Sequence, residues 1–362
     1  MIVVMAISAS TSEIQQVVSA IEGQGMRALI MPGGERLAIG IPSAIPPDKR
    51  ELLALNLGGL PGVEHVAHVS RPYKLASREF HRADTVVAIR KVCFGGSQIQ
   101  VIAGPCSVES YEQMSVAAHA VRESGAAVLR GGAFKPRTSP YAFQGLQEEG
   151  LKILHEVGQR QGLLTISEVM QPDLVGLVAS YVDILQIGAR NMQNFPLLIE
   201  AGRSAHPVLL KRGPSATLDE FLLAAEYLLS QGNQNVILCE RGVHPLDRSY
   251  TRNTLDLGAV PVLKDVSHLP VFVDPSHGVG VSRYVPAMAL AAVAAGADGV
   301  MIEMHPEPRK ALSDGPQSLT PLQFQALMTQ MRQLGSAVGR SFPAGRADSF
   351  LETKDAQPDR NS

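Results

Sequence analysis

The first pattern of apolar and polar positions covers residues 1–70 and alternates between short apolar runs and helical periodicity. One helix is predicted to begin at Thr11, which can cap it, because Ile14, Val17 and Ile21 recur on one face. The predicted elements follow the order βαββαβ: strands at 2–5, 28–31, 37–41 and 63–69, and helices at 11–23 and 47–57. This order is typical of a small ferredoxin-like domain. Such a domain could bind an effector, mediate assembly or be purely structural.

The second pattern covers residues 96–337, where continuous apolar runs alternate with helical stretches. Eight runs are visible: 100–103, 127–129, 163–166, 184–187, 208–210, 236–238, 271–273 and 299–302. Such alternation indicates a parallel sheet that is covered on both faces. Eight units predict an α/β fold of the closed (β/α)8 TIM-barrel type. Residues 71–95 are then a linker and barrel entry, and the polar tail at 338–362 is predicted to be disordered.

Composition narrows the function classes. Hydrophobic residues make up 45% and charged residues 18%, which suits a globular chain with a sizeable core. The net charge of -2 gives no reason to expect nucleic acid or an anionic membrane as partner. The apolar run at 287–295 is too short to span a bilayer. The sparse, odd set of Cys93, Cys106 and Cys239 favours a reducing, cytoplasmic location.

Candidate metal ligands follow three of the predicted strands. In a barrel, residues after the strands' carboxyl ends face a common centre. Cys106, His277 and Glu303 follow strands that become neighbours on closure, and Asp314 can return to the same corner. For each residue alone, burial as a small hydrophobe or ion pairing is the favoured explanation. Together, their sulfur, nitrogen and oxygen atoms indicate a site for Mn²⁺, Fe²⁺, Co²⁺ or Zn²⁺.

A second set at the strand ends is cationic. Its members are Arg130, Lys135, Arg137, Arg190, Lys211 and Arg241. Arginine binds phosphate and carboxylate oxygens in bidentate fashion, and lysine supplies a movable charge. Pairing with Glu168, Glu240 and Asp274 would absorb only part of this charge. The substrates are therefore expected to carry at least two anionic groups.

Four stretches resemble one enzyme family, 3-deoxy-D-arabino-heptulosonate 7-phosphate (DAHP) synthase of the type I beta branch. They are Ala103–Ser107, Leu129–Ser139, Gln186–Asn191 and Val273–His277. The resemblance runs from residue 1 to about residue 337 and includes the ferredoxin-like domain. It implies a transferase that joins phosphoenolpyruvate to erythrose 4-phosphate and releases phosphate. That reaction is the first step of the shikimate pathway of aromatic amino acid biosynthesis, on the way to chorismate.

The resemblance also implies roles for individual residues. The family's metal ligands fall on Cys106, His277, Glu303 and Asp314. Its phosphoenolpyruvate-binding cations fall on Arg130, Lys135, Arg190, Lys211 and Arg241. The segment that resembles the erythrose 4-phosphate site comprises Lys135, Pro136, Arg137, Thr138 and Ser139. The implied catalytic residues are Lys135, Cys106 and His277, with Lys135 exchanging a proton with the aldehyde oxygen or with the attacking water.

Three alternatives stay open at this stage. The first is a 3-deoxy-octulosonate 8-phosphate synthase that uses arabinose 5-phosphate, although Pro136-Arg137-Thr138 favours the four-carbon sugar. The second is a non-catalytic barrel that acts as a sensor, which predicts the loss of a site residue. The third is a Schiff-base aldolase that uses Lys211.

Regulation and assembly are implied by the resemblance alone. Related enzymes bind tyrosine or phenylalanine at the N-terminal domain, and a homotetramer is common in this branch. The second predicted strand, Ala28-Leu29-Ile30-Met31, carries no side-chain donor or acceptor for such an effector. Gly278-Val279-Gly280 also departs from the Ser-Gly-Gly that often follows the metal-binding histidine.

Overall fold

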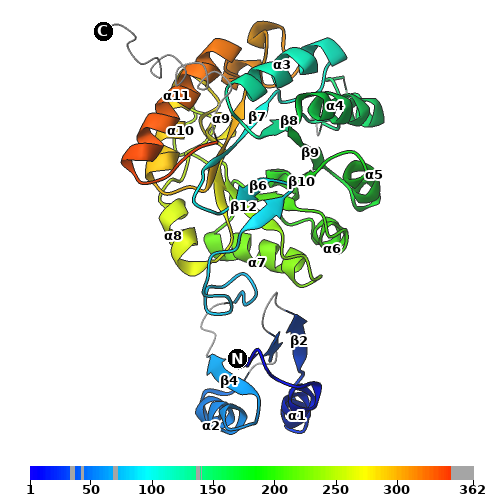
Figure 1. Cartoon of the computed structure of the whole chain (residues 1–362), viewed down its shortest axis with the longest axis vertical. Coiled ribbons are helices and arrows are strands. Elements are labelled where there is room, and N and C mark those ends of the chain that lie inside the picture. The colour runs from blue at the N-terminus through cyan, green and yellow to red at the C-terminus, as the bar shows by residue number, and fades with distance from the viewer. Residues whose placement is uncertain (33–36, 42–44, 68–71, 136–138, 140, 344–362) are drawn as a thin grey trace, which may run out of the picture.

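The N-terminal domain has the predicted ferredoxin-like fold. The computed structural model describes residues 1–32, 37–41, 45–67, 72–135, 139 and 141–343. An antiparallel sheet with the strand order β2-β3-β1-β4 is covered on one face by two helices (Figure 1). These elements are β1 (Ile2–Met5), α1 (Thr11–Glu22), β2 (Leu29–Pro32), β3 (Leu37–Gly40), α2 (Pro47–Gly58) and β4 (Val63–Ala67).

Successive side chains of β1 point to opposite faces of this small sheet, and both faces are buried. Val3 and Met5 pack with the apolar stripes of α1 and α2, whereas Ile2 and Val4 belong to a cluster with Tyr73 of the linker. Ser10, rather than Thr11, caps α1: its side chain accepts a hydrogen bond from the backbone of Glu13, which in turn binds the backbone of Ser10.

Within the described residues, eight parallel strands close into a barrel that is surrounded by helices, as predicted (Figure 1). The strands are β7 (Gln100–Gly104), β8 (Val128–Arg130), β9 (Leu164–Val169), β10 (Ile184–Ile187), β11 (Val208–Lys211), β12 (Val236–Glu240), β13 (Val271–Val273) and β14 (Gly299–Glu303). The longer helices around them are α3 (Tyr111–Glu123), α4 (Gln147–Gln161), α6 (Phe195–Arg203), α7 (Leu218–Leu229), α8 (Ala259–Val266), α10 (Val285–Ala294) and α11 (Pro321–Ala337). Short helical elements are α5 (Val175–Ala179), α9 (Pro275–Val279), η1 (Pro172–Leu174), η2 (Ala189–Asn191), η3 (Ser282–Tyr284), η4 (Pro308–Lys310) and η5 (Gly315–Gln317).

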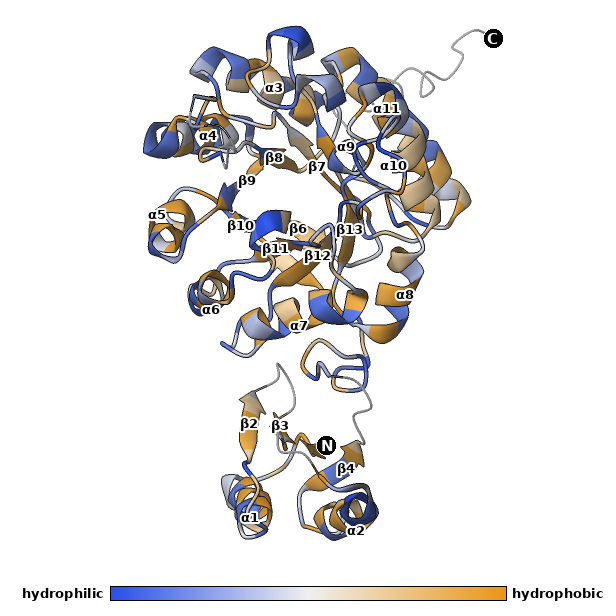
Figure 2. Ribbon diagram, turned by 180° about the vertical axis from the view of Figure 1, so that it is seen from behind, coloured by the Kyte–Doolittle hydropathy of each residue, from blue (hydrophilic) through white to orange (hydrophobic). Residues whose placement is uncertain are grey.

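The barrel strands and the surrounding helices differ in hydrophobicity. The barrel strands are mostly hydrophobic, whereas the surrounding helices carry both hydrophobic and hydrophilic residues (Figure 2). This arrangement follows from a parallel sheet that is buried on both faces while its helices meet solvent on one side.

A two-stranded hairpin, β5 (Val87–Ile89) paired with β6 (Val92–Phe94), lies in the segment that was predicted as linker and barrel entry. Val87 and Phe94 are fully buried in the same cluster as the side chains inside the barrel, including Phe272. The Phe94 and Phe272 ring centroids are 5.8 Å apart. The hairpin therefore closes the end of the barrel opposite the strands' carboxyl ends.

The prediction that the tail is disordered is wrong for residues 338–343. Arg340 forms an ion pair with buried Asp298, and the Ser341 carbonyl accepts a hydrogen bond from Ile99. Phe342 packs against the core. These contacts order the segment even though its sequence is polar. The rest of the predicted tail, 344–362, lies outside the described residues.

Candidate active site

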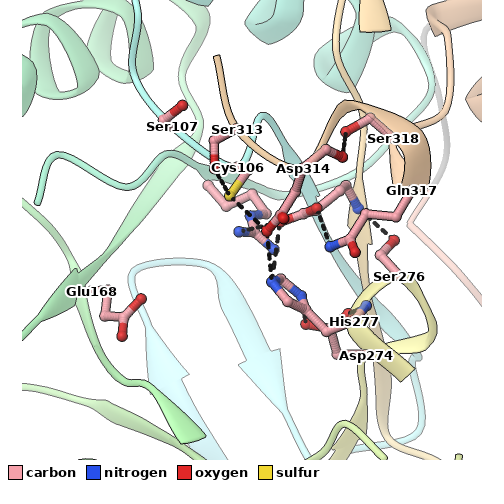
Figure 3. Close-up of polar contacts among 12 residues, drawn as sticks. Cys106, Ser107, Glu168, Asp274, Ser276, His277, Ser313, Asp314, Gln317 and Ser318 are labelled. Atoms are coloured by element: carbon pink, nitrogen blue, oxygen red, sulfur yellow. Dashed lines mark hydrogen bonds and ion pairs between the residues drawn. The ribbon is translucent and has the colours of Figure 1, made fainter. Parts of the chain in front are cut away.

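The four predicted metal ligands meet at one corner of the barrel mouth, where Figure 3 shows Cys106, His277 and Asp314. Cys106 follows β7, Glu303 ends β14, and His277 lies in α9, directly after β13. Asp314 comes from the loop between η4 and η5 and adopts a left-handed backbone with φ 54°. Because β13, β14 and β7 are consecutive in the barrel, ligands from distant parts of the sequence become neighbours.

Short contacts join these four side chains. Cys106 Sγ lies 3.3 Å from Asp314 Oδ2, and His277 Nε2 lies 3.3 Å from Glu303 Oε1 and 3.7 Å from Asp314 Oδ2. Ligand atoms of Cys106, Glu303 and Asp314 all fall within 4.8 Å of one another. This distance leaves room for one ion among them.

The orientation of His277 makes the corner fit a cation. Its Nδ1 lies 2.7 Å from Asp274 Oδ2, and a carboxylate can only accept, so Nδ1 carries the proton. In the neutral ring, the Nε2 lone pair then faces two carboxylates that also offer only lone pairs. Burial lowers the pKa of His277, which favours this neutral ring, although Asp274 and Glu303 oppose the effect. A divalent cation would satisfy all three groups at once.

Burial, hydrogen bonds and nearby charges of both signs decide the protonation of the corner. Burial and the charge of Glu303 raise the pKa of the Cys106 thiol to about 12. Burial alone would also raise the pKa of Asp274, but His277 and Lys211 outweigh it and hold this pKa well below the usual value. Asp274 is thus an anion that orients His277, while Cys106 needs a cation to become a thiolate.

Glu303 and Asp314 are held by further polar side chains. Gln317 donates a hydrogen bond of 2.6 Å to Glu303 Oε2, and Arg130 Nη2 lies 2.9 Å from Glu303 Oε1. Arg252 Nη1 lies 3.5 Å from Asp314 Oδ1 and donates to Gln317 at 3.1 Å. Each carboxylate therefore has a defined orientation before any ligand binds.

A cavity of about 340 Å³ opens beside this corner. Seven cations line it: Arg130, Lys135, Arg190, Lys211, Arg241, Arg248 and Arg252. Glu168 and Asp314 are the lining carboxylates. Figure 3 shows Glu168 on the side of the site away from Asp314. The excess of positive charge suits the cavity to small, multiply charged anions.

Five of the six predicted cations line this cavity, and Arg137 lies outside the described residues, as does Thr138. Ser139 is described, but it is exposed and is not among the residues that line the cavity. Glu240 does not pair with the cations that line the cavity; it accepts a bond from Arg212, which also binds Asp256.

Several polar residues at the site were not predicted. Arg248, Arg252 and His244 come from the long loop after β12, and Gln317 comes from η5. The alternation of strands and helices carries no information on where such loops turn. The recurrence of arginine along the β12–α8 loop, in a chain of nearly balanced charge, was the available signal for Arg248 and Arg252.

Comparison with known proteins assigns both parts of the chain. Residues 82–340 match the model of the DAHP synthetase I family, and residues 1–71 match that of the DAHP synthase ferredoxin-like domain. The chain belongs to the DAHP synthetase I family. Among its curated relatives, the phospho-2-dehydro-3-deoxyheptonate aldolase of Thermotoga maritima is 48% identical over 94% of this chain and 99% of its own.

Solved structures of this family agree with that assignment. A crystal structure of the Thermotoga maritima DAHP synthase has a TM-score of 0.75 at 46% identity and covers 94% of this chain and 98% of its own. Among the curated sequence relatives, a more distant one is the 2-dehydro-3-deoxyphosphooctonate aldolase of Desulfatibacillum aliphaticivorans. It is 35% identical and covers 67% of this chain and 94% of its own.

Proposed function

We propose that this chain is a DAHP synthase that condenses phosphoenolpyruvate with erythrose 4-phosphate and releases phosphate, the first step toward chorismate and the aromatic amino acids. The observation that carries the proposal is one cavity in which a ring of cations adjoins a cysteine, histidine and carboxylate corner. The two substrates bring two phosphates and one carboxylate, which match the excess of positive charge. Holding both anions together is the main physical obstacle to the reaction, and these cations offset their repulsion.

Arg130 and Lys211 are the proposed anchors of phosphoenolpyruvate at the floor of the cavity. Arg130 is almost fully buried, and its Nε and Nη1 have no hydrogen-bond partner within the described residues. A buried donor without a partner raises the free energy of the folded protein. An anionic ligand that accepts hydrogen bonds from Nε and Nη1 of Arg130 would remove this cost. Arg190 and Arg241 are proposed to complete the set around the same anion, and Arg137, Thr138 and Ser139 to bind erythrose 4-phosphate.

Lys135 is the proposed proton donor. Its ammonium group lies 3.1 Å from Cys106 Sγ and 2.9 Å from the Cys106 carbonyl oxygen. Burial alone would lower the pKa of Lys135, but Cys106 as a metal-bound thiolate, together with the charge of Glu168, outweighs it and raises this pKa. Lys135 is thus protonated beside the metal corner, and we assign it the transfer of a proton to the aldehyde oxygen rather than the activation of water.

The resident metal is proposed to be Mn²⁺, Fe²⁺, Co²⁺ or Zn²⁺, held by Cys106, His277, Glu303 and Asp314. A bound divalent cation supplies Lewis acidity toward the aldehyde oxygen. The mixed thiolate, imidazole and carboxylate donors suit these borderline ions better than Mg²⁺ or Ca²⁺.

The alternatives lack a supporting observation. The chain carries all four proposed metal ligands, and five of the predicted cations line the cavity, so the loss of a site residue that a non-catalytic barrel predicts is not observed. A Schiff-base aldolase that uses Lys211 would leave the corner of Cys106, His277, Glu303 and Asp314 without a function. The octulosonate aldolases match this chain at lower identity and over less of its length.

The test is phosphate release from phosphoenolpyruvate with erythrose 4-phosphate or arabinose 5-phosphate, before and after EDTA treatment, with each metal restored singly. We expect activity with the four-carbon sugar only, lost in EDTA. Cys106→Ala should abolish activity at every metal concentration. Cys239→Ala is the matched control, because Cys239 is equally buried but contacts none of the proposed ligands within the described residues. Normal activity of Cys106→Ala would contradict the metal site.

Assembly and control are proposed from the family resemblance: a cytoplasmic homotetramer whose N-terminal domain binds tyrosine or phenylalanine. In β2, Leu29 and Ile30 are partly exposed and Met31 is buried, so an effector would have to take its polar contacts elsewhere in the domain. Light scattering would give the oligomeric state. Rates that stay unchanged in saturating tyrosine and phenylalanine would contradict the effector. Among the described residues, none of the helices is long and apolar enough to cross a membrane.

A further inference from the structure

Glu109 occupies a position between two elements that each carry a proposed metal ligand. It follows β7 by five residues of chain and lies near Cys106 in the sequence, but it reaches across to the loop after β14. Its side chain is only 12% exposed and lies outside the cavity lining. The proposed reaction assigns it no role.

The Glu109 carboxylate is fully engaged. Oε1 accepts hydrogen bonds from the backbone N–H of Leu312 at 2.9 Å and from the Ser107 hydroxyl at 3.2 Å. Oε2 lies 3.3 Å from His305 Nε2. Burial would raise the pKa of Glu109, but the hydrogen bonds from His305 and Leu312 outweigh it and lower this pKa, so the carboxylate is ionised.

His305 is fixed in the tautomer that donates to Glu109. Its Nδ1 accepts a hydrogen bond of 2.9 Å from the backbone N–H of Glu307, so the proton of the neutral ring sits on Nε2. The His305 backbone also donates to the Leu319 carbonyl. The Glu109 carboxylate therefore contacts both ends of the segment 305–312.

This segment leads directly into Asp314. The left-handed backbone of Asp314 costs a residue with a side chain about 1 kcal/mol and persists only where the surroundings hold it. Ser313 Oγ lies 3.0 Å from Cys106 Sγ, so the same turn also contacts the thiol. An anchor at Leu312 therefore fixes both the position and the backbone of the ligand loop.

We infer that Glu109, together with His305, is a positioning residue that holds Asp314 against Cys106 and so sets the affinity of the corner for a divalent cation. The inference rests on the proposed metal site. Removal of a residue that orients a metal ligand without contacting the metal typically lowers metal affinity by about 10- to 100-fold. Glu109→Ala removes all three hydrogen bonds. Glu109→Gln keeps an acceptor for Leu312 but presents an N–H group toward the His305 donor.

The experiment measures the dissociation constant of Mn²⁺ and of Zn²⁺ by competition with a chromophoric chelator, together with the apo protein's melting temperature. Glu226→Ala is the matched control, because Glu226 is also partly buried and accepts hydrogen bonds from two backbone N–H groups, but these belong to Leu75 and Ala76 of the linker and not to a loop that carries a proposed metal ligand. We expect affinity to fall at least about tenfold in Glu109→Ala, less in Glu109→Gln, and not at all in Glu226→Ala.

The outcomes separate the two proposals. A wild-type protein that binds neither metal overturns the proposed metal site. A wild-type protein that binds metal, with Glu109→Ala binding it equally tightly, overturns the role of Glu109 alone. If Glu109→Ala fails to fold, His305→Phe serves instead: it removes only the Nε2 donor and the Nδ1 acceptor, and unchanged affinity in this variant would overturn the inference as well.

Discussion

Acidification is expected to loosen the linker from the barrel through His268. This side chain precedes β13, is 2% exposed and joins two parts of the linker. Its Nε2 donates to the Leu75 carbonyl at 2.7 Å, and its Nδ1 accepts from the Thr85 hydroxyl at 2.6 Å. Burial lowers the pKa of His268 from 6.5 to about 4, so the folded protein holds the neutral ring.

The sign and size of the effect follow from this difference. Between pH 6.5 and 4 the unfolded chain binds a proton at His268 that the folded chain excludes, so the free energy of unfolding falls as the pH falls. The contribution is complete above pH 6.5, is lost progressively toward pH 4 and amounts to about 3 kcal/mol in total.

The assay is urea denaturation of the wild type and His268→Gln at half-unit steps from pH 7.5 to 4.5. Glutamine can donate to Leu75 and accept from Thr85 but does not titrate, so its stability should fall less steeply than that of the wild type. Between pH 7.5 and pH 4.5, the free energy of unfolding of the wild type should fall by about 2.5 kcal/mol more than that of His268→Gln. His119→Gln, at an exposed histidine, should follow the wild type. Parallel curves for the wild type and His268→Gln would refute the reasoning.

Three further substitutions test the rest of the structure. Phe94→Ala should lower the free energy of unfolding by about 3–5 kcal/mol, because it opens a cavity at the closed end of the barrel; calorimetry should show this loss. Arg212→Met should cost about 3–5 kcal/mol by leaving Glu240 buried without its cation, and a loss as small as that of a surface pair would contradict the ion pair. Asp274→Asn should weaken metal binding about 10- to 100-fold by releasing His277, and chelator competition measures it.

The barrel could be predicted because its strands are buried on both faces and therefore remain apolar throughout. The hairpin of β5 and β6 could not, because three-residue strands are too short to show an alternating pattern. Its turn contains Arg90 and Lys91, which resemble an ordinary polar linker, and Arg90 adopts a left-handed backbone that its residue type does not suggest. Only the packing of Val87 and Phe94 inside the barrel reveals the hairpin's role.

The metal corner was predictable for a similar reason. Cys106, His277 and Glu303 lie at or within a few residues of the carboxyl ends of strands, so the geometry of a closed barrel dictates where they point. Gln317 lies in the short helix η5 and Arg252 in the loop between β12 and α8. The path of both segments depends on contacts with the rest of the protein, and no spacing rule applies to them. Sequence reasoning therefore predicted which side chains meet at the corner and missed the polar side chains that contact them.

Each carboxylate at the corner also neutralises a cation of the cavity: Glu303 contacts Arg130, and Asp314 contacts Arg252. A divalent cation bound at the corner would draw on the charge of both carboxylates and leave the two arginines to attract anions instead. Metal and phosphoenolpyruvate should therefore bind with mutually increased affinity, because each relieves the charge that the other leaves unbalanced. Isothermal titration of phosphoenolpyruvate with and without metal measures this coupling, and equal affinities would mean that the corner and the cavity act independently.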